Sequence, residues 1–422
     1  MSMRSGAEPP PGGGARAPRP PFSFGWLFAG NWLAYSSYGV LLAVLPIAEL
    51  AEGGGPLLAT LVVGAPLLAQ TLAAWGWGWL ADRTGARRAP LVLAVLLEAP
   101  LFLLFPLVDS AGLFVVRVAQ SALFGAVVLA TTQATEDPSA SAAFRLGRLQ
   151  LAQNGGMLLG VAVAFPLLLG ASFRLDSSAG WELAILLAAL TAAAAVAFGL
   201  AGDLPRPPPA PALTEFTPAS HPTVFWLAGA TTAVSTARFL AATAIPVYLA
   251  STLARGGFFG WPANATEQLA LWVAVSSALN LGASPFSGRW AETSEVRRRS
   301  LLAFAFVYVV IWTLIAVVPT YPAVFATWCL PVAVFFTVAG VREAAHWSGP
   351  AERGRAVGLL TAAFNLGGLL GGGAAGWLLA AAVPAPTVFG IAAVGSLAAA
   401  LLLLPVVARR VAAAEPVRTS AS

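Results

Sequence analysis

The amino-acid sequence predicts an all-α membrane protein with twelve transmembrane helices, arranged as two six-helix bundles related by a pseudo-twofold axis. Three observations lead to this prediction: the composition, the number of long apolar stretches, and the return of features from the first half in the second. Hydrophobic residues make up 58% of the 422 residues and charged residues only 10%, with a mean hydropathy of +0.79. Soluble domains contain about 25% charged residues, so we expect this chain to lie in a lipid bilayer.

The apolar stretches predict where the helices cross. Residues 1–21 are mostly Pro, Gly, Ala and Arg, which predicts a disordered tail. Phe22 then leads into a full-length apolar stretch, so we expect the first helix to be retained and not removed as a signal peptide. A span of about 20 apolar residues crosses a hydrocarbon core of roughly 30 Å. Such spans lie near 23–47, 57–80, 89–107, 111–133, 147–170, 181–201, 223–250, 267–288, 300–318, 322–342, 356–381 and 386–408.

A Pro-rich segment divides these spans into two groups of six. Prolines within spans, among them Pro100, Pro285 and Pro331, predict bends and not helix ends, because neighbouring helices in a bundle can satisfy the freed carbonyls. The expected organisation is a disordered cytoplasmic tail, an N-terminal bundle, a cytoplasmic linker, a C-terminal bundle and a second cytoplasmic tail, at 1–21, 22–202, 203–221, 222–408 and 409–422.

The placement of arginine predicts the orientation. With both termini cytoplasmic, every arginine outside the spans except Arg174 and Arg255 falls on the cytoplasmic side, as the positive-inside rule requires. The arginines occur one to three at a time between apolar runs and form no basic face, so we expect no nucleic-acid partner. The single cysteine, Cys329, can form neither an internal disulfide nor a metal site. From the spans and the placement of arginine we expect a multi-pass protein of a prokaryotic cytoplasmic membrane.

One short stretch marks each half. Gly78–Arg88 places an acid, three arginines and two glycines between two apolar runs, so it must form a polar turn between the second and third helices. A related stretch, Gly288–Arg299, follows half a chain later, and Asn154–Gly160 in the fifth span is echoed by Asn365–Gly371 in the eleventh. The chain therefore looks duplicated as two parallel repeats. Small residues four apart let helices approach closely, so the Gly clusters predict packing faces.

These motifs resemble those of a known family. Gly78–Arg88 resembles motif A of the major facilitator superfamily, and Leu113–Gln120 is similar to its fourth-helix motif B, although Ser121 stands where that family usually has Gly. The resemblance extends from about Phe22 to Val407, and the chain is similar to the family's exporters of drugs and small molecules. It implies two six-helix bundles around a central cavity, lined by helices one, four, seven and ten, and transport by alternating access.

The charged turn is a candidate latch at the cytoplasmic side. The Asp82 carboxylate can accept hydrogen bonds from the free N–H groups of a helix N-terminus, and the resemblance implies that this is the start of the eleventh span, after Arg355. Arg83 or Arg87 can pair with Glu136 or Asp137. The alternative is that the charges only determine topology. In the second copy Thr293 and Glu295 replace an arginine and a glycine, which predicts a weaker latch. The expected latch residues are Gly78, Asp82, Arg83, Gly85, Arg87 and Arg88.

Three ionisable residues lie deep within spans, where charge is costly and is usually functional or paired. Arg117, with the nearby Gln120, lies on a helix that the resemblance places at the cavity, and in that family this arginine is associated with proton transfer. The alternative is a structural hydrogen bond to carbonyl groups. Glu98 is a candidate proton carrier, because desolvation favours the protonated form of a carboxyl group, or a structural partner of Arg117.

The third ionisable residue, Arg238, falls near the middle of the seventh span. It can bind an anionic group of the substrate or repel cations. Asn31 and Tyr35 in the first span are further candidates for substrate contacts, with helix packing as the alternative. The first span has no acid before Glu49 at its outer end, which is unlike many proton-coupled drug exporters.

These features predict a secondary active transporter that exports small organic molecules by proton antiport. The alternatives are uptake or exchange of an organic anion, or a non-transporting membrane sensor with the same fold. No clustered nucleophile, base or metal ligands indicate an enzyme, so we expect no enzymatic activity and no cofactor or metal. The expected partners are the small-molecule substrate, protons as coupling ion and the lipid bilayer, and the expected state is monomeric.

Overall fold

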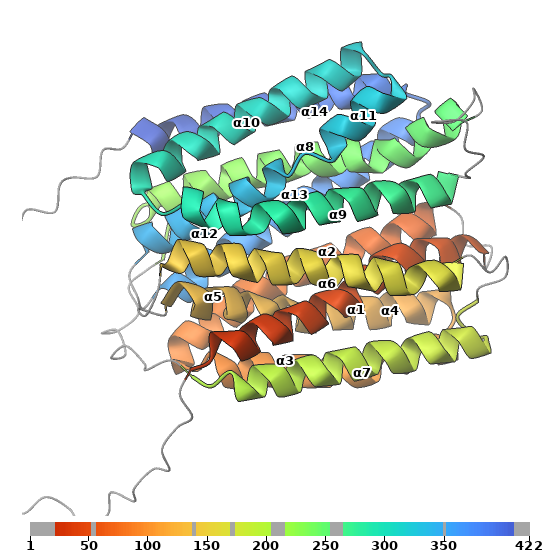
Figure 1. Ribbon diagram of the computed structural model, residues 1–422, viewed down its shortest axis with the longest axis horizontal. Coiled ribbons are helices and arrows are strands. Elements are labelled where there is room, and N and C mark those ends of the chain that lie inside the picture. The colour runs from red at the N-terminus through yellow and green to blue at the C-terminus, as the bar shows by residue number, and fades with distance from the viewer. Residues whose placement is uncertain are drawn as a thin grey trace, which may run out of the picture.

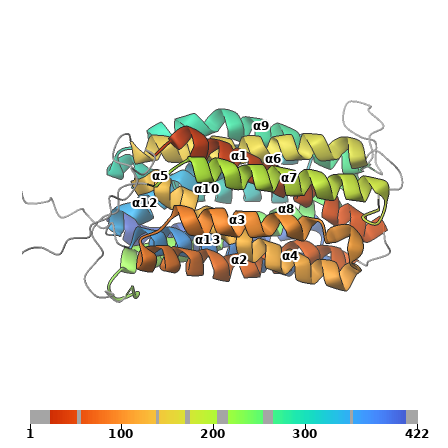
Figure 2. The same ribbon diagram turned by 90° about the horizontal axis from the view of Figure 1, so that it is seen from below.

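The computed structural model describes residues 22–51, 56–136, 141–168, 174–203, 216–253, 265–348 and 352–408, and the regular structure in these ranges is helical. The long helices run side by side along the longest axis of the molecule (Figure 1), and the view turned by 90° agrees (Figure 2). The first half contains α1 (Phe24–Ala51), α2 (Pro56–Thr84), α3 (Arg88–Phe102), η1 (Phe105–Leu107), α4 (Ser110–Phe124), η2 (Gly125–Val127), α5 (Val128–Glu136), α6 (Ala142–Leu168) and α7 (Ser178–Leu200). The second half contains α8 (Pro222–Leu253), α9 (Ala265–Trp290), α10 (Ser294–Val317), α11 (Tyr321–Trp328), α12 (Val332–Trp347), α13 (Arg353–Ala380) and α14 (Ala385–Ala408).

These elements make twelve crossings, because three expected spans are built from more than one element. α3 leads into η1, α4 continues through η2 into α5, and α11 and α12 together form the tenth crossing. Within the described residues, eight segments are long and apolar enough to span a membrane. The other four crossings, α1, α2, α6 and α9, contain 28, 29, 27 and 26 residues, and at 1.5 Å per residue each is long enough to cross a bilayer. The predicted all-α membrane fold is confirmed.

Prolines have different effects in different crossings. Pro285 lies inside α9, which continues to Trp290, whereas α3 ends at Phe102, in the same turn as Pro100 and against the prediction that this proline would not end a helix. At Pro331 the prediction of a bend was wrong, because α11 ends at Trp328 and α12 begins at Val332. Proline has no backbone N–H and its ring clashes with the carbonyl of the preceding turn. In the tenth crossing these two effects interrupt the helix.

The two halves form two bundles that lie beside each other, with the first half in red to yellow-green and the second in green to blue (Figure 1). Between the bundles, α2 packs against α13 and α6 packs against α9. Both contacts bring backbones together: a Cβ atom on Gly78 would lie 2.3 Å from the Gly354 carbonyl oxygen, and one on Gly147 would lie 2.6 Å from the Ser284 carbonyl oxygen. The interface between the bundles therefore requires glycine at these points.

Glycines also join helices within each bundle. A Cβ atom on Gly160 of α6 would lie 2.2 Å from the Ser36 carbonyl oxygen of α1. A Cβ atom on Gly371 of α13 would lie 2.2 Å from the Thr236 carbonyl oxygen of α8. The two repeated Gly clusters thus make equivalent packing faces, as their spacing predicts.

Replacing Gly371 by Ala is expected to destabilise the protein by about 1–3 kcal/mol, the range for overpacking a close contact. The new methyl group would overlap the backbone of α8, which cannot move aside as a flexible side chain does. Thermal unfolding of the purified protein measures the effect. Gly373 on the same helix has open space around its Cα atom, so Gly373→Ala is the matched control and should unfold at the wild-type temperature or above it. Equal unfolding temperatures for the two variants would contradict the predicted packing face.

Candidate functional site

The carboxylate of Asp82 joins the two bundles. It lies in the last turn of α2 and faces the first residues of α13, where Oδ1 accepts a hydrogen bond from the backbone N–H of Gly354 at 3.2 Å and Oδ2 one from Arg355 at 2.8 Å. The first N–H groups of a helix have no partner within the helix, and its positive dipole end favours an anion. Asp82 therefore caps a helix that belongs to the other half of the chain.

The electrostatics of Asp82 follow from its position. It lies beyond the expected end of the second span, and burial raises the pKa of its carboxyl group to about 6, against the opposing effects of Arg87 and of the bond from Arg355. The group is therefore charged at neutral pH. We refer below to this end of the molecule, which the arginine distribution predicts to be cytoplasmic, as the Asp82 end.

Arg87 connects Asp82 to α5. Its Nη2 atom lies 3.1 Å from Asp82 Oδ1 and 2.9 Å from Glu136 Oε1, and its Nε atom donates to the same Glu136 oxygen at 3.3 Å. The turn that positions Arg87 contains Gly85 with a φ of 64°, a conformation that favours glycine. Among the described residues no contact joins Arg83 to this network, and its guanidinium lies 5.2 Å from the ring centre of Trp79.

Arg88, the last residue of the turn, makes a contact of its own, and one expected partner of the turn is not described. The backbone N–H of Arg88 donates to Asp203 Oδ1 at 3.3 Å, after α7. Asp137, the other expected partner, lies outside the residues that the structure describes. Of the alternative pairings that the sequence left open, the structure contains that of Arg87 with Glu136.

Residues that the sequence reasoning missed extend this cluster to the start of α8. Arg355 Nε lies 3.5 Å from Asp82 Oδ2, and its Nη2 lies 3.4 Å from Glu352 Oε1. Glu352 Oε2 lies 2.7 Å from His221 Nε2. Phe216 stacks on the His221 ring and lies under the Arg355 guanidinium. The i, i+3 spacing of Glu352 and Arg355 at a helix start was the available signal, whereas the distant Phe216 and His221 offered none.

The second copy of the turn uses its charges differently. Glu292, the counterpart of Asp82, is exposed, and within the described part of the chain its side chain makes no hydrogen bond or ion pair. The buried Arg297 instead pairs with Glu343 of α12 at 2.6 Å, and Trp347 Nε1 donates to the same carboxylate at 2.7 Å. These contacts stay inside the C-terminal bundle, so α6 and α9 meet mainly through backbone packing and a 3.2 Å hydrogen bond from Asn154 to Ser284.

The buried charges of the N-terminal bundle form one chain of hydrogen bonds. Gln120 Nε2 donates to Glu98 Oε1 at 2.8 Å, and Arg117 Nη1 donates to Gln120 Oε1. All three side chains are buried. Glu98 on α3 and Arg117 on α4 are thus joined through the Gln120 amide, an arrangement that both sequence interpretations of Glu98 allow.

The polar residues of the first helix lie in a different environment. Asn31 is fully buried and donates to the Leu27 carbonyl at 3.0 Å, which leaves its Oδ1 atom without a partner. Tyr35 and Tyr38 pack on Phe124 of α4, with ring centres 5.3 and 4.9 Å from it. The two tyrosines therefore belong to an aromatic cluster between α1 and α4.

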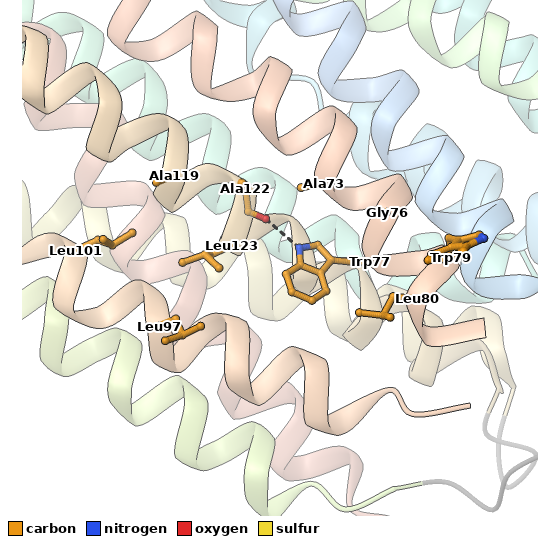
Figure 3. Close-up of a pocket in the computed structure, with 10 residues that line it drawn as sticks. All are labelled: Ala73, Gly76, Trp77, Trp79, Leu80, Leu97, Leu101, Ala119, Ala122 and Leu123. Atoms are coloured by element: carbon orange, nitrogen blue, oxygen red, sulfur yellow. Dashed lines mark hydrogen bonds between the residues drawn. The ribbon is translucent and has the colours of Figure 1, made fainter. Parts of the chain in front are cut away.

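Two cavities differ sharply in polarity. The larger, of about 740 Å³, is a groove between α2, α3 and α4, where Trp77 donates to the Ala122 carbonyl at 2.9 Å (Figure 3). Its lining is apolar and includes exposed side chains such as Leu97, so it suits the lipid-facing surface and not a polar substrate. The smaller cavity lies in the C-terminal bundle and is lined by Arg238 of α8 together with polar groups of α9, α10 and α11.

Comparison with known proteins agrees with this architecture. The model of the Major Facilitator Superfamily matches residues 27–340 and 227–421. The crystal structure of the human organic anion transporter MFSD10 (TETRAN) is similar at a TM-score of 0.69 with 18% identity, over 90% of this chain and 98% of that one. The transporter FucP in its outward conformation is similar at a TM-score of 0.68 with 15% identity, over 92% of this chain and 99% of that one. The proton:xylose symporter XylE is similar at a TM-score of 0.66 with 14% identity, over 91% of this chain and 95% of that one. No curated protein matches the sequence. With its twelve crossings, its two bundles and a family model that covers nearly all of it, the chain belongs to the major facilitator superfamily.

Proposed function

We propose that this membrane transporter works by alternating access and that the Asp82 contact is the latch that closes one end of it. The observation that supports this proposal is the pair of hydrogen bonds from the α13 N-terminus to a carboxylate of the opposite bundle. A contact that crosses between the bundles must break if their Asp82 ends move apart. The contacts of Arg297 with Glu343 lie within one bundle and can persist during that motion.

The strength of the latch suits a switch. A hydrogen bond to a charged group contributes about 1.5–3 kcal/mol, and a charge at a helix N-terminus about 0.3–2 kcal/mol. Shifting a two-state equilibrium from 1:99 to 99:1 needs a difference in ligand affinity of roughly 5.5 kcal/mol. Two such hydrogen bonds are therefore comparable with the binding energy that a substrate can supply, so the closed end can hold without being permanent.

The cargo and driving force that we propose are small organic molecules exported across the cytoplasmic membrane by antiport with protons. The buried chain of Glu98, Gln120 and Arg117 supports proton coupling, because it places a carboxyl group and a guanidinium on one hydrogen-bonded path in the membrane interior. A proton arriving at Glu98 removes the negative charge that this path otherwise balances. Such a change alters the relative energies of the two transport states.

A second candidate is transport of an organic anion. Arg238 favours it, because this side chain is a cation in a part of the bundle that is otherwise almost free of charge. The similar human structure is described as an organic anion transporter. Absence of any transported solute, with the latch contacts intact, would instead favour the membrane-sensor alternative.

Asp82→Asn is expected to open the Asp82 end more often, because the neutral amide accepts more weakly from α13 and loses the ion pair with Arg87. The measurement is the rate at which a thiol reagent labels a cysteine introduced at Ala74, which is fully buried beside Gly358 of α13, in a protein whose Cys329 is replaced by Ser. We expect labelling to become at least about tenfold faster, which corresponds to a loss of 1.4 kcal/mol.

The control for this experiment is Asp176→Asn, which makes the same chemical change in an exposed ion pair with Arg174. It should label at the wild-type rate. If the introduced cysteine is labelled equally slowly in the Asp82→Asn and Asp176→Asn variants, the latch role of Asp82 is wrong.

Glu98→Gln is expected to abolish proton-driven flux while downhill exchange of the same cargo continues, because the amide fills the same space but cannot carry a proton. The measurement uses proteoliposomes and a cargo found by a thermal-shift screen, with an imposed pH gradient and with a protonophore. Glu182→Gln, which removes an exposed acid of α7, is the matched control and should keep gradient-driven flux. If the wild-type protein transports the cargo at the same rate with and without the protonophore, proton coupling is refuted.

A further inference from the structure

A small polar cavity lies inside the C-terminal bundle, enclosed by four consecutive crossings. It measures about 20 Å³, which is enough for one guest of about the size of water. Its polar lining comprises Arg238 of α8, Ser276 and Asn280 of α9, Tyr308 and Trp312 of α10, and Thr327 of α11. The cavity is thus shaped for a single small atom or group that is bound by polar contacts.

No acid among the described residues balances the charge of the cavity. Among the described residues Arg238 makes no ion pair, and the contact found for its guanidinium is with the Phe239 ring at 5.9 Å. The sequence explains why: across the six expected spans of the second half, the one acid is Glu267, the first residue of the eighth span. A cation in the membrane interior is costly and normally has a partner. A partner for Arg238 must therefore be found elsewhere than in these spans.

Trp312 supplies an unused donor at the same place. Its side chain is 2% exposed, and its Nε1–H group has no hydrogen-bond partner. The indole is held in position by stacking on Tyr308, with ring centres 5.9 Å apart. An indole N–H can only donate, so its natural complement in this cavity is an acceptor such as an anion.

Asn280 places an unpaired hydrogen-bond acceptor in the same cavity as Arg238. The Asn280 amide nitrogen donates to Ser276 at its carbonyl oxygen, 2.8 Å away, and at its Oγ atom, 3.3 Å away, which leaves Asn280 Oδ1 buried without a donor. A guanidinium has five N–H donors. Arg238 can therefore donate to Asn280 Oδ1 and to an anion together when its side chain turns into the cavity.

The internal repeat relates this cavity to the buried charges of the N-terminal bundle. The 210-residue offset that relates Arg87 to Arg297 also relates Glu98 to Tyr308 and Arg117 to Thr327. In the N-terminal bundle this position is filled by the hydrogen-bonded chain of Glu98, Gln120 and Arg117, which contains both signs of charge. In the C-terminal bundle the acid is replaced by a tyrosine, the cation comes from α8, and a small space remains.

We propose that this cavity binds a monovalent anion through the Arg238 guanidinium and the Trp312 indole N–H, with the anion in the place of the missing carboxylate. The shared chemistry is a small, singly charged acceptor, supplied either by a free halide or by a free carboxylate as small as formate. Binding itself does not depend on the proposed transport function. Only the movement of the anion across the membrane rests on it.

The test is anion-dependent thermal stability of the purified full-length protein at constant ionic strength, with gluconate replaced stepwise by chloride, formate or acetate. Gluconate is too large for the cavity and serves as the reference anion. The wild-type protein should be stabilised saturably by at least one of the small anions. Arg238→Gln should raise the half-saturating concentration about tenfold or more, since hydrogen bonds to charged groups have at least that effect. Trp312→Phe, which keeps the stacking on Tyr308 but lacks the N–H, should raise it about tenfold.

The matched control is Arg174→Gln, which removes the same charge from an exposed ion pair and should respond as wild type does. A response to chloride identifies a free inorganic anion as the occupant, and a response to formate and acetate alone identifies a small carboxylate. If Arg238→Gln fails to fold, Trp312→Phe alone decides the question. A wild-type protein that responds to none of the small anions, or a Trp312→Phe variant with wild-type half-saturation, overturns the proposal. Failure of proton-driven flux would not alter these binding results.

Discussion

The hydrogen bonds from the α13 N-terminus to Asp82 are the interaction on which the arrangement of the two bundles at this end depends. The helix start offers N–H groups that its own backbone cannot satisfy, and α2 brings a carboxylate to them because Gly78 lets the two backbones touch. Arg87 then ties the same carboxylate to Glu136, and Arg355 ties it to Glu352 and the residues that precede α8. Four separate segments of the chain therefore meet at one buried negative charge.

The two halves share a repeat but have distributed their charges differently. In the first half the acid of the charged turn reaches across to the other bundle, whereas in the second half Glu292 is exposed and Arg297 is satisfied by Glu343 within its own bundle. The interior shows the same divergence. One half has a complete chain from Glu98 to Arg117, whereas Arg238 in the other half makes no ion pair with the described residues. Both contacts between the bundles include close backbone packing, and charged groups add to this packing between α2 and α13 but not between α6 and α9 among the described residues.

Part of the candidate site could be predicted from the sequence and part could not. The contact of Asp82 with a helix start, and the pairing of Arg87 with Glu136, were among the alternatives derived from residue chemistry and from the family resemblance. The choice between Arg83 and Arg87 was open, since both are flexible arginines in one turn, and it depended on how that turn packs. Phe216, His221 and Glu352 lie more than a hundred residues from Asp82 in sequence, so local pattern contained no sign that they would join its cluster.

By itself the sequence determined the membrane environment, the twelve crossings and the internal repeat, because these follow from the length and spacing of apolar runs and from residue types within single segments. The tertiary structure decided which polar groups meet. It decided that Gln120 stands between Glu98 and Arg117, that Pro331 interrupts a helix, and that Trp312, whose indole N–H has no partner, lines the same cavity as Arg238. The physical reason is that the hydrophobic effect acts on each segment according to its own composition, whereas hydrogen bonds act over about 3 Å and depend on how separate helices pack.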